Sequence, residues 1–96
     1  MIITYELSDI SDLDSLYGAA LGHEDNEFRY DKFILDLRMY RTYCHKGELY
    51  KAGRALNDAR DDLFVLLEGL DSGFAYEDAD FMLDMYIPEY MDGWQY

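Results

Sequence analysis

Residues that form covalent or metal-bound sites are scarce in this 96-residue sequence, which has one cysteine and two histidines. Because Cys44 has no second cysteine, an intrachain disulfide is excluded and the fold must depend on its apolar core. The sequence also lacks Cys-x-x-Cys, His-Glu-x-x-His and a glycine-rich phosphate loop. The adjacent residues His23-Glu24-Asp25 and Cys44-His45 point in different directions on a helix. We therefore expect no metal site, no cofactor and no enzymatic activity.

Long apolar runs are absent as well. The longest uninterrupted one, residues 63–67, is far shorter than the roughly 20 residues that cross a bilayer. Met1 is followed neither by a basic segment nor by such a run, so we expect a cytoplasmic protein without a signal peptide. Half of the residues are nevertheless hydrophobic, which is enough to build one acidic helical domain, residues 1–96, around a core.

Basic residues are confined to the middle of the sequence. The eight lysines and arginines all lie between Arg29 and Arg60, whereas residues 61–96 contain ten acidic residues and no basic one. The net charge of −13 repels nucleic acid and anionic membranes and attracts basic protein surfaces. We therefore expect a basic protein as the partner, with no direct binding to nucleic acid or membrane.

The most regular apolar pattern lies in residues 48–70. Apolar residues recur there at alternating steps of three and four, which is typical of a helix that buries one narrow seam. The seam consists of Leu49, Ala52, Leu56, Ala59, Leu63, Leu66 and Leu70. We expect a long central helix in the core of the domain. A coiled-coil dimer seam is the alternative, which the alanines disfavour.

Weaker apolar repeats complete a mainly α fold, a small bundle of three to four helices. They indicate further helices near residues 9–21, 27–44 and 76–87. Alternation of apolar residues within 81–87 also allows a strand there. In either case we expect Pro88 to end the element, because proline lacks a backbone N–H.

The two ends of the chain have distinct compositions. Residues 1–7 are rich in β-branched and aromatic residues, which favours an extended arm or an edge strand. Residues 88–96 are acidic and aromatic, which predicts a tail that folds back on the core or offers a peptide-like motif.

The predicted second helix is apolar on two sides. Phe33 and Leu37 lie on one side, whereas Phe28, Leu35 and Met39 lie on nearly the opposite one. A 96-residue domain has little room to bury both sides. The alternative function is therefore a structural or adaptor module that forms a homodimer, or a larger homo-oligomer, through Phe28, Leu35 and Met39.

Carboxylates form outward-facing stripes on the last two predicted helices. Side chains three or four residues apart on a helix are about 5–6 Å apart, which is close to the spacing of successive phosphates along a nucleic-acid strand. Tyrosine and tryptophan among the acids would add contact area. The predicted partner-binding residues are Asp58, Asp61, Glu68, Glu77, Asp80, Asp84, Tyr90 and Trp94. A solvated surface that only keeps the protein soluble explains the same stripes equally well.

In composition, this small, acidic, tyrosine-rich chain is similar to nucleic-acid-mimicking inhibitors of phages and mobile elements, which include anti-restriction and anti-CRISPR proteins. The similarity implies a non-enzymatic inhibitor that blocks a basic nucleic-acid-binding enzyme of a bacterial host, such as a CRISPR or restriction nuclease. A competing interpretation is direct nucleic-acid binding, since basic and tyrosine side chains are interleaved in the middle of the chain. They are Arg38, Arg41, Lys46 and Lys51 with Tyr40, Tyr43 and Tyr50. The net charge of −13 disfavours this second interpretation.

Overall fold

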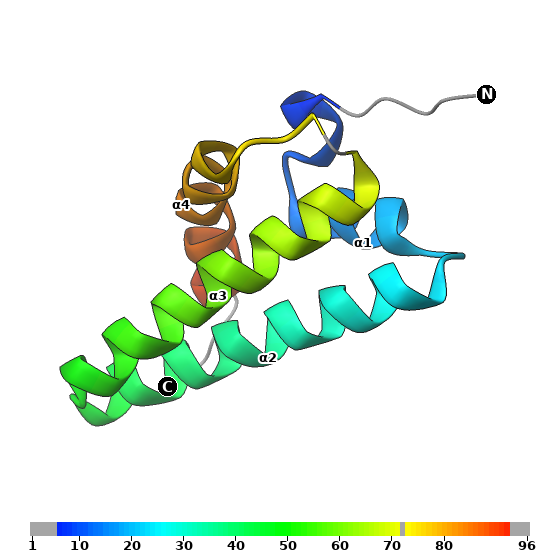
Figure 1. Ribbon diagram of the computed structural model, residues 1–96. Helices are drawn as coiled ribbons and strands as arrows, with labels where there is room; N and C mark the ends of the chain where they lie inside the picture. The colour runs from blue at the N-terminus through cyan, green and yellow to red at the C-terminus, as the bar shows by residue number, and fades with distance from the viewer. Residues whose placement is uncertain (1–5, 72, 93–96) are drawn as a thin grey trace.

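The computed structural model describes residues 6–71 and 73–92. Within these ranges the chain forms four α-helices and one short 3-10 helix, and no strand (Figure 1). Their bounds are η1 Leu7–Ile10, α1 Leu13–Ala20, α2 Glu24–Lys46, α3 Leu49–Leu70 and α4 Tyr76–Asp92. The predicted mainly α bundle with a long central helix is thus confirmed.

An antiparallel hairpin of α2 and α3 forms the long axis of the molecule, which measures 47 × 24 × 23 Å (Figure 1). Gly47 makes the turn between the two helices, because its φ of 74° lies in the left-handed region that glycine adopts without strain. The N–H of Glu48 then donates to the carbonyl of Tyr43 at 2.9 Å and closes the end of α2. The short turn fixes the two longest helices side by side.

The core lies where all four helices meet, away from the Gly47 turn. Its largest fully buried side chains are Ile10, Leu16, Phe33, Leu37, Leu63, Leu66, Leu67, Met82, Leu83 and Tyr86. The Tyr86 hydroxyl donates to the carbonyl of Ile10, which ties α4 to η1 across the core. The core thereby holds α4 in a fixed position against α3.

In the predicted seam of α3, Ala52 is buried and Ala59, Leu63 and Leu66 are completely enclosed, whereas Leu56 and Leu70 are half-buried. The prediction was wrong for Leu49, which is 75% exposed. Leu49 lies at the hairpin end, whereas α1 and α4 pack against the other half of the hairpin (Figure 1). Helical periodicity gives the direction of a side chain, but it does not show how far the neighbouring helices extend.

The expectation that Pro88 ends its element was also wrong, because α4 continues through it. Beyond the proline, a Glu89 carboxylate oxygen accepts a hydrogen bond from the N–H of Leu13 at 2.9 Å. The guanidinium carbon of Arg41 lies 4.6 Å from the ring centroid of Tyr90. These contacts with α1 and α2 hold the last turns of α4 in place despite the missing proline N–H.

Several predicted boundaries differ from the structure. Residues 81–87 are helical, which confirms the predicted helix over its strand alternative, but 88–92 belong to α4 rather than to a tail. Residues 93–96 and 1–5 lie outside the described residues, and Leu7 belongs to η1 instead of an extended arm.

The predicted first helix is divided into η1 and α1. Asp12 begins α1, since its Oδ1 accepts a hydrogen bond from the N–H of Ser15 at 2.7 Å. Hydrogen bonding by Ser15 lowers the pKa of the Asp12 carboxyl.

α2 is longer than predicted at both ends. Its first turn is acidic, and its last turn contains His45 and Lys46. This arrangement complements the helix dipole.

Candidate acidic interface

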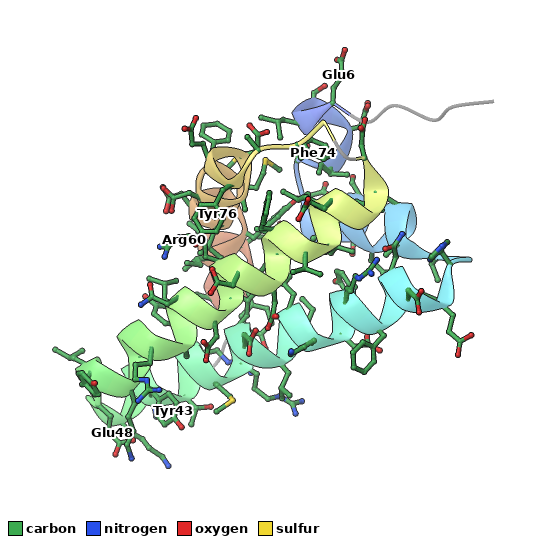
Figure 2. The ribbon with its side chains drawn as sticks, in the orientation of Figure 1. Glu6, Tyr43, Glu48, Arg60, Phe74 and Tyr76 are labelled. Carbon is green, nitrogen blue, oxygen red and sulfur yellow. The ribbon has the colours of Figure 1, made fainter. Side chains whose placement is uncertain are left out.

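Acidic residues of two helices come together where α4 packs against α3. The Tyr76 hydroxyl donates to Asp61 Oδ1 at 2.8 Å, and Arg60 Nε donates to Asp80 Oδ1 at 2.7 Å. Figure 2 shows Arg60 and Tyr76 close together at this junction. Asp61 and Asp80, which the sequence placed on separate helices, therefore share one surface.

The packing of α4 decides which of its acids face outward. Ala79 and Met82 are completely buried against the rest of the fold, and the ring of Tyr76 meets that of Phe64 at 5.4 Å in an edge-to-face arrangement. The opposite side of α4 is exposed. The exposed acids predicted as binding residues on the two helices are Asp58, Asp61, Glu68, Glu77, Asp80 and Asp84. We refer to these six carboxylates as the acidic face.

A hollow of about 360 Å³ lies within the acidic face and is lined by Arg60, Tyr76, Glu77 and Asp80. The Arg60 side chain is 23% exposed and forms an ion pair with Asp80. The hydrogen bond to the Asp61 carboxylate raises the pKa of the Tyr76 hydroxyl, so this phenol stays protonated at neutral pH. The hollow therefore offers carboxylate acceptors to an incoming cation, together with an aromatic side chain beside them.

The groove between α2 and α3 extends this acidic surface. A second hollow of about 350 Å³ is lined by Lys32, Asp36, Asp58, Asp61 and Asp62. Burial raises the pKa of Asp36 to about 7, assisted by its hydrogen bond with Asp62 and by the charge of that residue. Lys32 Nζ lies 3.6 Å from Asp62 Oδ1 and partly offsets the repulsion. Asp61 lines this hollow and also accepts the hydrogen bond from Tyr76, so it connects the groove between α2 and α3 with the acids of α4.

Sequence reasoning missed two kinds of residue here. It did not select Asp36 and Asp62, whose proximity depends on the register of α2 against α3. It also missed Phe81 and Met85, which are 57% and 40% exposed on α4. The sequence does contain a signal for them, because a helix that buries Met82 places residues 81 and 85 on its outer side.

Tyr90, a predicted contact residue, does not belong to the acidic face. Tyr90 is half-buried, packs against the core and lies over Arg41. Trp94 lies outside the described residues.

Lys51, near the hairpin end, makes contacts within the fold. Lys51 Nζ lies 3.5 Å from Glu48 Oε1 and 5.8 Å from the ring centroid of Tyr43. Tyr43 and Glu48 lie at the far end of the hairpin from the core (Figure 2). Of the cations that suggested base stacking, Arg41 and Lys51 thus already contact tyrosine rings of the fold.

In the part of the chain that the structure describes, no three histidine, cysteine or acidic side chains are arranged to hold a metal ion. None of the described helices combines the length and the hydropathy that a bilayer span requires. No family model, curated protein or solved structure matches this chain.

Proposed function

We propose that this protein is a non-enzymatic inhibitor that blocks a basic nucleic-acid-binding protein by presenting the acidic face in place of nucleic acid. The observation that carries the proposal is the placement of six exposed carboxylates on two helices that share one core. Arg60 pairs with Asp80, one of the six, and from residue 61 onward the chain has no further lysine or arginine. An array that is ordered before binding loses little conformational entropy when it meets its partner.

The chemistry of the acidic face fits a partner rich in lysine and arginine. Charge-assisted hydrogen bonds between such cations and carboxylates are roughly twice as strong as neutral ones. Phe81 and Met85 are exposed on α4, the helix that carries three of these carboxylates. They add apolar contact area, and binding energy in protein interfaces concentrates in a few such contacts. A phage or mobile element that encoded such a protein would direct it against a defence enzyme, for example a CRISPR or restriction nuclease.

The test is capture from a bacterial lysate on immobilised protein, washed first at about 0.1 M and then at about 0.5 M salt, because the Debye length is about 10 Å at the lower concentration and shrinks as salt rises. The variant combines Glu77→Gln, Asp80→Asn and Asp84→Asn. A matched control combines Asp9→Asn, Asp14→Asn and Asp92→Asn, which removes three exposed charges outside the acidic face instead. Circular dichroism verifies that both variants fold.

We expect the native protein and the control to retain a basic nucleic-acid-binding protein that high salt releases. The α4 variant should lose most of it. Equal loss in both variants would mean that net charge alone attracts the partner. Equal retention in both would exclude the acidic face as the binding surface.

A further inference from the structure

The outer side of α2 carries a line of exposed apolar side chains. Phe28, Leu35 and Met39 are 68%, 50% and 41% exposed. Together with Lys32 and Thr42 they follow an alternating repeat of four and three residues, which is the repeat of helices that pack side by side. The exposure predicted for these three residues is thus present, and the repeat gives the direction in which a partner helix would run along them.

The two halves of α2 carry opposite charge on their exposed surface. The first half has three exposed acids and one cation, namely Glu24, Asp25, Asp31 and Lys32. The second half has the exposed cations Arg38 and Lys46 and no exposed acid. Leu35 lies midway between Glu24 and Lys46, the two ends of the helix. A surface of this kind is complementary to itself when it is turned by 180° about Leu35.

We infer that a second copy of this chain packs antiparallel along the outer side of α2, with the two-fold axis close to Leu35. Leu35 and Met39 of both copies form the apolar centre of the contact. Glu24 and Asp31 face Lys46 and Arg38 of the second copy. A parallel arrangement would oppose like charges at both ends.

A two-fold dimer of this kind leaves the α4 part of the acidic face accessible, namely Glu77, Asp80 and Asp84. The α3 part lies beside the contact, because Lys32 and Met39 each line a hollow that Asp58 also lines. The inference therefore goes beyond the proposed function and does not depend on it. Two copies would present two acidic faces on one particle, so that simultaneous engagement would raise the avidity for a partner with two binding grooves.

The first test is the molar mass at tens of micromolar, measured by size exclusion with light scattering. We expect twice the 11.3 kDa of the chain. Leu35→Glu combined with Met39→Glu should give the monomer. Phe81→Glu combined with Met85→Glu makes the same chemical change at exposed sites on α4 and should leave the dimer intact. A monomeric native protein, or equal disruption by both pairs, would overturn the inference.

The second test is the orientation of the two copies, measured by oxidative cross-linking in a Cys44→Ser background. Leu35→Cys should cross-link to itself, because it lies near the two-fold axis. Lys46→Cys should not cross-link to itself but should do so with Glu24→Cys in a mixture of the two variants. Self-cross-linking of Lys46→Cys would indicate a parallel contact and would contradict the antiparallel arrangement. These single substitutions decide the question even if the double glutamate variant fails to fold.

Discussion

Gly69 lies where α3 comes closest to the start of α2. Asn26, which is 4% exposed, donates through Nδ2 to the Gly69 carbonyl at 3.2 Å and accepts from Arg29 Nη1 at 2.9 Å. A Cβ at residue 69 would collide with both Asn26 Oδ1 and Arg29 Nη1. Because Asn26 is buried and held by two hydrogen bonds, it has little room to move aside. The absence of a side chain at residue 69 therefore permits the contact.

We predict that Gly69→Ala lowers the free energy of unfolding by about 1–3 kcal/mol, the usual cost of overpacking. Gly53→Ala, in the same helix, is the matched control, since a Cβ there meets nothing within 4 Å. This control should stabilise the protein by about 0.5–1 kcal/mol through helix propensity. Urea unfolding measures both. A shift in the same direction for the two variants would show that residue 69 is not sterically restricted.

Asp36 makes stability depend on pH. Its folded-state pKa of about 7 lies above its ordinary value of 3.8, chiefly because of burial and then because of Asp62. The folded state therefore holds an extra proton between about pH 4 and pH 7, and stability falls as the pH rises through this range.

Asp36→Asn removes the titration, so we predict a variant more stable than the native protein at pH 8 and a flatter stability curve between pH 4 and 8. Asp31→Asn, which changes an exposed acid of the same helix, serves as the control and should leave the slope unchanged. The measurement is urea unfolding across this pH range. An unchanged slope in Asp36→Asn would exclude the Asp36–Asp62 pair as its origin.

At the scale of elements, the end of α4 helps to fix α1. Glu89 accepts the hydrogen bond of the Leu13 N–H, one of the donors that the first turn of a helix leaves without a partner inside the helix. We predict that Glu89→Ala destabilises the protein by about 0.5–2 kcal/mol, as loss of a helix cap does. Asp92→Ala, near the same end of α4, should have little effect. Identical thermal unfolding of both variants would show that this contact contributes nothing.

The helices were predictable to different degrees, and the reason lies in what determines each one. The seam of α3 follows from the spacing of the apolar residues within the helix itself, so the segment 48–70 was predicted almost to the residue. Pro88 shows the opposite case, because contacts of Glu89 and Tyr90 with distant helices keep α4 continuous through it. Local sequence contains the proline signal but not the tertiary contacts that override it.

For the acidic face, too, one part could be predicted from the local sequence and another part could not. Helical periodicity was enough to predict that Asp61, Glu77 and Asp84 point outward, and each is exposed. It was not enough to predict that Asp61 would bond Tyr76 or that Arg60 would bond Asp80, since these pairs depend on how α4 crosses α3. Whether the face binds a partner stays a prediction.

For the whole molecule, charge is separated along the 47 Å axis. Residues 38–54 contain five lysines and arginines and one acid, Glu48, so all but one of the 21 acidic residues lie elsewhere. The Debye length at physiological ionic strength is about 8 Å, which is much shorter than the molecule. Charges at the tip of the hairpin are therefore screened from those on α4, whereas Arg54 and Asp58 line one hollow and lie close enough to interact. The net charge of −13 understates the local field of the acidic face.

The proposal of nucleic-acid mimicry is tested most directly by competition for one partner. A labelled DNA duplex is bound to the purified partner at about 0.1 M salt, where the Debye length is about 10 Å, and its fluorescence anisotropy is followed as this protein is added. We predict that the protein displaces the duplex completely, and that the variant with Glu77→Gln, Asp80→Asn and Asp84→Asn requires a much higher concentration. A ternary complex, in which the duplex stays bound while this protein binds, would contradict the mimicry.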